Sequence, residues 1–128
     1  MMPLNKIMYV EDEADIREVA QLALELVGGY SLLICSSGQE AIDKAEAFAP
    51  DLILLDVMMP SMDGPMTLAK LRKFPHLIHT PVVFMTAKVQ PNEVTALRNL
   101  GALEVIAKPF DPMLLATQLR EIWETRHV

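Results

Sequence analysis

The 128-residue chain contains a single cysteine, Cys35, and no long uninterrupted hydrophobic run. One cysteine cannot form a disulfide within the chain, and its isolation fits a reducing compartment. No apolar run approaches the roughly 20 residues that a membrane-spanning helix needs. The first residues, "MMPLNK", lack the apolar segment and cleavage site of a signal peptide. We therefore predict a cytoplasmic protein without a membrane partner.

Positive charge is also scarce. The chain has 11 Lys and Arg residues against 17 Asp and Glu residues, for a formal net charge of −6. A nucleic-acid-binding protein needs a basic face to neutralise phosphates, so we expect no direct contact with DNA or RNA. The glycine-rich phosphate-binding motifs G-x-x-x-x-G-K-[ST] and G-x-G-x-x-G are both absent. These absences argue against nucleotide-binding enzymes built on either loop.

Apolar residues make up 52% of the chain and fall into regularly spaced runs. Five of these runs are typical of strands, because they are short, apolar and rich in branched side chains. They occupy residues 6–10, 30–36, 51–56, 81–86 and 103–108. Helical patterns follow them at 14–27, 37–48, from 65, at 91–100 and at about 111–125. Such alternation predicts one α/β domain with a doubly wound five-stranded parallel sheet covered by helices on both faces.

Several predicted helices have recognisable faces or ends. The segment 14–27 places one apolar face on Ile16, Val19, Ala20, Ala23 and Leu26. Ser37 and Glu40 have the spacing of a capping box, in which each side chain bonds the other residue's backbone N–H. Asp111 followed by Pro112 predicts the start of the fifth helix.

Chemically reactive side chains stand where the predicted strands end. The stretch "LILLDVMMPSMDG" (52–64) runs through a buried strand directly into Asp56 and then turns away. In open parallel sheets, functional sites lie outside the carboxyl ends of the strands. The residues delivered there are Glu11, Asp12, Asp56, Thr86 and Lys108.

This set of side chains indicates a particular chemistry. Three carboxylates held together repel one another, so a proton or a cation must neutralise them. Carboxylate oxygens with room for water suit Mg²⁺. A phosphoryl group is the anion that a metal and an ammonium can bind together, and Asp56 can act as its nucleophile. Thr86 is expected to donate a hydrogen bond to one phosphoryl oxygen, and Lys108 to pair with another.

Four segments together resemble the receiver domain of two-component response regulators, including its single-domain chemotaxis member. They are "YVEDE" (9–13), "LILLDVMMPSMDG" (52–64), "VVFMTA" (82–87) and "AKPF" (107–110). The similarity covers about residues 5–125. It implies the flavodoxin-like strand order 2-1-3-4-5, a single receiver domain over 1–128 without an output domain, and a cis bond before Pro109.

The resemblance also implies a role for each site residue. Asp56 is the phosphoacceptor and a metal ligand, Asp12 is a direct Mg²⁺ ligand, and Glu11 assists through water. The backbone carbonyl of Met58 completes the protein ligands, and Mn²⁺ is a possible substitute. Thr86 and Lys108 bind the phosphoryl group. The expected donor is a sensor histidine kinase or a histidine phosphotransfer protein, and phosphorylation switches binding of a downstream protein target. The chain is thus expected to signal rather than to act as an enzyme, with only slow autodephosphorylation.

Three positions differ from common members of that family. Receivers usually carry Tyr or Phe three residues before the lysine, whereas this chain has Val105. Fast-dephosphorylating members place an amide or acid two residues after the phosphoacceptor and two after the threonine. Here those residues are Met58 and Lys88.

Three other readings of the sequence stand beside this one. A haloacid-dehalogenase-like phosphatase also uses a strand-end Asp nucleophile, but it carries a second Asp two residues later, where this chain has Met58. A flavodoxin-like FMN binder needs a Ser/Thr/Gly loop after the first strand, and here that loop reads "EDEAD". A receiver-like module could instead bind partners without being phosphorylated.

Overall fold

The sheet in the computed structural model, which describes residues 3–126, has five parallel strands. Its order is β2-β1-β3-β4-β5, so the predicted topology is confirmed. The strands are β1 (Lys6–Val10), β2 (Ser31–Cys35), β3 (Leu52–Asp56), β4 (Val82–Thr86) and β5 (Glu104–Ala107). The central strands β3 and β4 are buried along their whole length, as expected for unalternating apolar runs covered on both faces.

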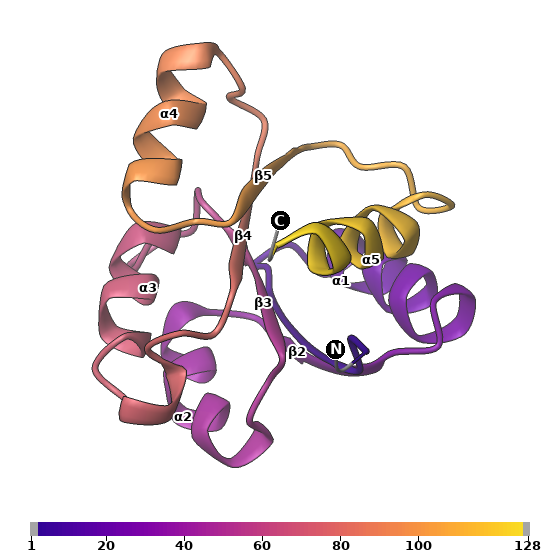
Figure 1. Ribbon diagram of the computed structural model, residues 1–128, viewed down its shortest axis with the longest axis horizontal. Coiled ribbons are helices and arrows are strands. Elements are labelled where there is room, and N and C mark those ends of the chain that lie inside the picture. Colours follow the sequence, from indigo (N-terminus) through magenta and orange to yellow (C-terminus); the bar gives the residue numbers. More distant parts are fainter. Residues whose placement is uncertain (1–2, 127–128) are drawn as a thin grey trace.

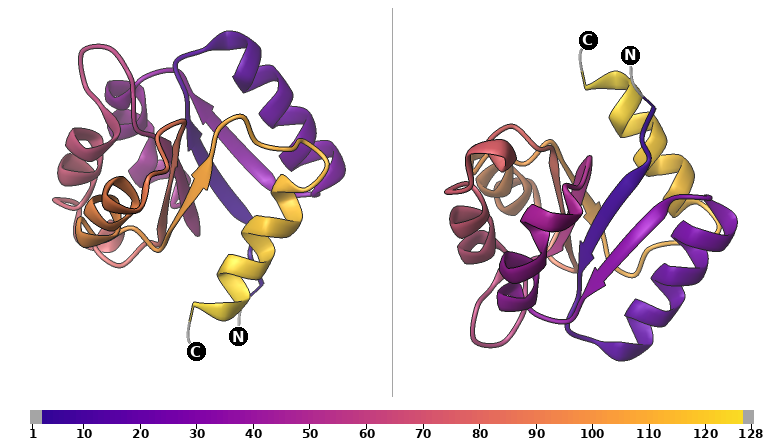
Figure 2. Two further views of the ribbon diagram at one scale, coloured as in Figure 1. Left: turned by 90° about the horizontal axis from the view of Figure 1, so that it is seen from above. Right: turned by 90° about the horizontal axis from the view of Figure 1, so that it is seen from below.

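Helices cover both faces of the sheet (Figures 1 and 2). They are α1 (Ala14–Gln21), η1 (Leu22–Val27), α2 (Gly38–Phe48), α3 (Gly64–Leu71), η2 (Pro75–Leu77), α4 (Pro91–Asn99) and α5 (Leu115–Thr125). α1 and α5 pack on one face, and α2, α3 and α4 lie on the other. Each face has its own apolar core, because alternate residues of each strand point to opposite sides. Within residues 3–126, no helix combines the length and apolar character needed to cross a membrane.

The strand register brings the ends of the central strands to one edge. Val10, the last residue of β1, pairs with Leu55, and Asp56 pairs with Met85. The strand order reverses between β1 and β3, which is where open α/β sheets form their binding crevices. The acidic residues that follow β1 therefore lie beside the aspartate that ends β3.

The first helix departs from the predicted regular pattern. Its second half, η1, is a π-helix, in which the Gly28 N–H bonds the Ala23 carbonyl five residues earlier. The wider turn changes which side chains face the core. Leu24 is fully buried, whereas Leu26, which we expected on the apolar face, is 79% exposed. The prediction for Leu26 was wrong because it assumed 3.6 residues per turn throughout.

One predicted helix start and one predicted capping bond also need correction. The fifth helix begins at Leu115 rather than at Asp111, whose side chain and carbonyl instead hold a turn by accepting bonds from backbone N–H groups. Ser37 caps α2 as predicted, since its Oγ accepts the Glu40 N–H at 3.1 Å. Glu40, however, accepts the backbone N–H of Ser36 at 2.6 Å instead of that of Ser37.

Candidate functional site

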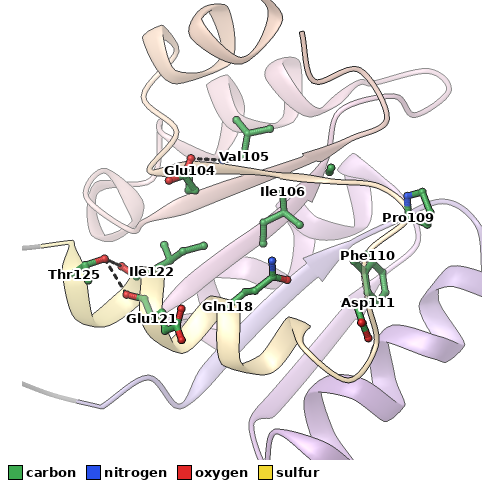
Figure 3. Close-up of a pocket in the computed structure, with 11 residues that line it drawn as sticks. Glu104, Val105, Ile106, Pro109, Phe110, Asp111, Gln118, Glu121, Ile122 and Thr125 are labelled. Atoms are coloured by element: carbon green, nitrogen blue, oxygen red, sulfur yellow. Dashed lines mark hydrogen bonds between the residues drawn. The ribbon is translucent and has the colours of Figure 1, made fainter. Parts of the chain in front are cut away.

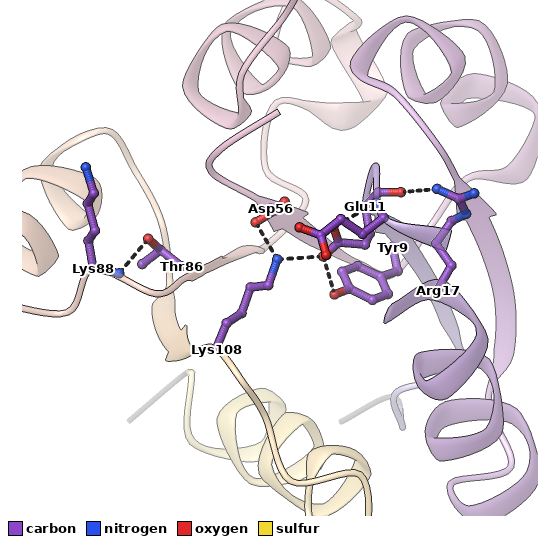
Figure 4. Close-up of polar contacts among 8 residues, drawn as sticks. Tyr9, Glu11, Arg17, Asp56, Thr86, Lys88 and Lys108 are labelled. Atoms are coloured by element: carbon purple, nitrogen blue, oxygen red, sulfur yellow. Dashed lines mark hydrogen bonds and ion pairs between the residues drawn. The ribbon is translucent and has the colours of Figure 1, made fainter. Parts of the chain in front are cut away.

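The predicted site residues from β1, β3 and β5 meet at the carboxyl edge of the sheet (Figure 4). Glu11 is fully buried, and Asp56 and Thr86 are each only 2% exposed. The Lys108 side chain is 15% exposed and reaches across the edge toward the two acids. Ionisable side chains this deeply buried are rare unless they are paired, so the arrangement itself requires charge compensation.

Lys108 bridges two of the acids. Its Nζ lies 2.9 Å from Glu11 Oε1 and 3.2 Å from Asp56 Oδ1. The backbone N–H of Lys108 donates to the Thr86 carbonyl at 2.9 Å, which extends the β4–β5 pairing to the site. The bond between Lys108 and Pro109 is cis, as the resemblance implied. One ammonium is thus shared by two buried carboxyl groups.

The third acid, Asp12, has an oxygen without a partner. Asp12 Oδ1 is buried and accepts no hydrogen bond within the described residues. Carboxylate oxygens of Glu11, Asp12 and Asp56 lie within 4.8 Å of one another. One ammonium cannot neutralise three carboxylates, so the donor set fits a hard divalent cation with oxygen ligands. The acidic cluster could therefore hold a metal ion.

The three charged partners have shifted pKa values. Burial, helped by the negative charge of Glu11, raises the pKa of Asp56 to about 7, although Lys108 opposes the shift. Burial also acts to raise the pKa of Glu11, but hydrogen bonds from Lys108 and the Glu13 N–H outweigh it and hold this pKa low. Burial acts to lower the pKa of Lys108, yet its bonds to the two acids hold that pKa high. Of the two acids that contact Lys108, Asp56 is therefore the one whose charge is less well compensated.

We expect the Asp56→Asn variant to be more stable than the wild type when EDTA removes divalent cations. The Asp56 pKa in the folded state, about 7, lies above its ordinary value, so folding becomes less favourable as pH rises between the two. Each pKa unit is worth about 1.4 kcal/mol, so a melting temperature at least about 3 °C higher is expected above pH 7. The gain should shrink toward pH 4.

Thermal unfolding followed by circular dichroism across this pH range checks the expectation. Asp43→Asn, on the exposed surface of α2, removes the same charge away from the site and is the control. A gain at Asp56 that is independent of pH, or that the control also shows, would contradict the burial argument.

The chain after Asp56 is held close to the strand end. The Gly64 N–H donates to the Val57 carbonyl at 2.9 Å, and Asp63 Oδ1 caps α3 by accepting the Met66 N–H at 2.9 Å. A Cβ on Gly64 would lie only 2.5 Å from the Asp56 carbonyl oxygen, so this fold-back needs glycine. Met58, within this loop, is 62% exposed.

Thr86 and Lys88 lie beside the cluster on the β4 side (Figure 4). Thr86 Oγ1 accepts the backbone N–H of Lys88 at 3.0 Å, which orients the hydroxyl group. The Lys88 side chain is exposed and points away from Lys108. Val105, on β5, is half-buried and packs against the core on the α2–α4 face.

Sequence analysis missed two contacts to Glu11. The Tyr9 hydroxyl donates to Glu11 Oε1 at 3.1 Å, and Arg17 Nη1 donates to the Glu11 carbonyl oxygen at 2.9 Å. Tyr9 could have been found by strand periodicity, because residues two apart point to the same face of a strand. No sequence pattern indicated the contact of Arg17, because this contact depends on the direction in which α1 continues from the loop after β1.

Comparison with known proteins decides the family. Residues 7–120 match the sequence model of the response regulator receiver domain. The chain belongs to this family. The receiver domain is similar to the "Alkaline phosphatase synthesis transcriptional regulatory protein PhoP" of Bacillus subtilis, at 37% identity over 118 residues. That match covers 92% of this chain and 48% of PhoP, so the receiver domain spans about half the length of this relative.

Solved structures agree with the assignment. The chemotaxis protein CheY4 of Vibrio cholerae superposes with a TM-score of 0.86 at 28% identity, covering 93% of this receiver domain and 98% of CheY4. The signal receiver domain of a signal transduction histidine kinase from Syntrophus aciditrophicus gives a TM-score of 0.79 at 32% identity. That match covers 94% of this chain and 90% of the other. Receiver domains are generally signalling domains, and both matches support this role.

Proposed function

We propose that this receiver domain accepts a phosphoryl group on Asp56 from the phosphohistidine of a sensor histidine kinase or a histidine phosphotransfer protein. The observation that carries the proposal is the shared contact of Lys108 with Asp56 and Glu11 beside the unpartnered oxygen of Asp12. An ion pair that only stabilises the fold needs a single acid for its single base. A surplus of buried carboxylates around a strand-end aspartate instead favours binding of a cation and an anion together.

In the proposed step, an Asp56 carboxylate oxygen attacks phosphorus. The P–O bond forms as the P–N bond to the donor histidine breaks, and the imidazole leaves and takes up a proton. Lys108 already lies 3.2 Å from Asp56 Oδ1, so it can pair with an oxygen of the incoming group. The Thr86 hydroxyl accepts a hydrogen bond from Lys88 N–H and retains its own proton for another phosphoryl oxygen.

We further propose that the acidic cluster binds Mg²⁺, with Mn²⁺ as a possible substitute. Asp12 and Asp56 would be direct ligands, together with the backbone carbonyl of Met58, and Glu11 would act through water. When bound, the ion supplies positive charge that offsets the phosphoryl oxygens. Asp12 Oδ1, which is buried and has no hydrogen-bond donor among residues 3–126, is an oxygen that such an ion could satisfy.

A surface for the donor protein is proposed beside Lys108. A shallow apolar pocket of about 230 Å³ lies between α1 and the loop after β5. Ile16 and Val19 of α1 face Pro109 and Phe110 across it, and Val19 is 39% exposed. Apolar side chains next to the nucleophile suit a partner that must bring its phosphohistidine to Asp56.

We propose that the signal for the downstream protein does not pass through the groove between β5 and α5. This groove, of about 590 Å³, has Ile106 of β5 opposite Gln118 and Ile122 of α5, whereas the Val105 side chain lies on the other face of the sheet (Figure 3). Val105 cannot swing a ring into the interior as an aromatic residue could. We therefore propose that the signal travels from Thr86 through the following loop into α4, and that residues 1–128 act as one receiver domain.

The Asp56→Asn variant tests the proposed function. With acetyl phosphate and Mg²⁺, the wild type should gain one phosphoryl group by intact mass, and the variant should gain none. Asp43→Asn, which removes an exposed carboxylate on α2, should be phosphorylated like the wild type. Phosphorylation of the Asp56 variant at the wild-type level would place the acceptor elsewhere. Failure of the wild type to incorporate phosphate would instead favour an interaction module that is never phosphorylated.

A further inference from the structure

Tyr9 lies directly beneath the site and has its hydroxyl aimed at it. The side chain is fully buried in the apolar core that β1 shares with α1 and α5. Its hydroxyl lies 3.1 Å from Glu11 Oε1 (Figure 4). A phenol buried this deeply needs a partner for its O–H group, and Glu11 is the partner in this structure. Burial and the nearby charges of Glu11 and Asp56 raise the pKa of Tyr9, so the group remains a neutral donor.

Glu11 Oε1 therefore has two side-chain donors, and they differ in mobility. Lys108 Nζ, at 2.9 Å, stands on a flexible side chain and also contacts Asp56. Tyr9 is fixed by the core and has only two side-chain torsions. Glu11 Oε2 accepts the Glu13 N–H at 3.2 Å. The carboxylate thus has three donors, of which Lys108 stands on the most flexible side chain.

We infer that Tyr9 is a positioning residue that holds Glu11 in place when Lys108 leaves it for the phosphoryl group on Asp56. This inference rests on the proposed function, because it needs Lys108 to change partners. In the resting state, Glu11 Oε1 has both donors. In the phosphorylated state, Tyr9 is its remaining side-chain donor, and a buried carboxylate that loses a donor carries a large desolvation cost. The Tyr9 hydroxyl therefore stabilises the phosphorylated state more than the resting state.

The consequence is measurable with beryllofluoride, a mimic of the phosphoryl group, in saturating Mg²⁺. Tyr9→Phe removes the hydroxyl and keeps the ring, and it should weaken beryllofluoride binding by about fivefold to tenfold. Tyr30→Phe is the matched control, since the Tyr30 hydroxyl donates to the Ala116 carbonyl and lies away from the acidic cluster. The control variant should bind like the wild type.

A second comparison, made in the Lys108→Ala variant, separates a positioning role of Tyr9 from a general effect of the Tyr9→Phe substitution on the core. In Lys108→Ala, no lysine leaves Glu11, so Tyr9→Phe should change beryllofluoride affinity by less than about twofold in that background. If Tyr9→Phe weakens binding equally in both backgrounds, or leaves it unchanged in the wild type, the inference is wrong. If the wild type itself binds no beryllofluoride, the proposed function fails as well, so the two failures are distinguishable.

The hydroxyl proton of Tyr9 provides a measurement that needs no variant. In the wild type with Mg²⁺ and beryllofluoride, this proton should remain hydrogen-bonded and visible in slow exchange with water by NMR. Its disappearance on adding beryllofluoride would overturn the inference even if Tyr9→Phe failed to fold.

Discussion

The Asp12→Ala variant is expected to bind Mg²⁺ at least about tenfold more weakly than the wild type, and to be phosphorylated poorly as a result. Asp12 Oδ1 is a buried oxygen that no donor in the described part of the chain contacts, so the variant loses a ligand that is free to bind the ion. Lys108→Ala should behave in the opposite way toward the metal. It removes a positive charge that contacts Glu11 and Asp56, so Mg²⁺ affinity should be unchanged or higher while the response to phosphorylation is impaired.

Calorimetric titration with Mg²⁺ distinguishes the two roles. Asp43→Ala, which removes an exposed acid from α2, controls for the change in net charge. If Lys108→Ala lost Mg²⁺ affinity as severely as Asp12→Ala, the assignment of one residue to the metal and the other to the phosphoryl group would be wrong.

Phosphorylated wild-type protein should lose its phosphoryl group slowly, and the double variant Met58→Asn with Lys88→Glu should lose it at least about tenfold faster. Hydrolysis needs a water molecule aligned opposite the Asp56 oxygen, and a side chain that accepts hydrogen bonds can orient it. Met58 offers only a weakly polar thioether, and charged Lys88 cannot accept a proton. A tenfold change corresponds to about 1.4 kcal/mol in the barrier.

Decay of the phosphorylated protein, followed by intact mass after removal of the donor, measures both lifetimes. The exposed residues Met66 and Lys73 allow a matched control, Met66→Asn with Lys73→Glu, with the same chemical changes away from the strand end. If the wild type already decays as fast as the Met58 and Lys88 double variant, these two side chains do not limit hydrolysis.

The strands and the acidic edge of the sheet could be predicted from the sequence because both depend on residues close together in the chain. A short unalternating apolar run such as "LILL", bounded by turn residues, favours a strand covered on both faces, and the confirmed order of the sheet then brings Asp56 beside the loop that follows β1. The acids at 11, 12 and 56 therefore meet as predicted.

The local sequence pattern did not predict the structure correctly at two places where tertiary packing decides the conformation. An amphipathic pattern over 14–27 does not reveal that the helix widens to a π-turn, which turned Leu26 out to solvent. The acidic cap at Asp111 predicted a helix start, but its side chain and carbonyl bond the N–H groups of a turn, and α5 begins only at Leu115. In both places contacts with the rest of the fold decide the conformation, because local propensity is a weak preference that tertiary packing overrides.

The residue types at the strand ends, and hence the kind of chemistry that the edge can support, can be read directly from the amino-acid order. How those side chains pair depends on the folded arrangement. The bond from Lys108 to Glu11 spans 97 residues of sequence, and its bond to Asp56 spans 52. Such contacts depend on strand order, register and depth of burial, and no local pattern encodes them. The burial of a side chain also depends on the folded arrangement. Tyr9 is a fixed donor for Glu11 because the core packed around its ring holds it in place.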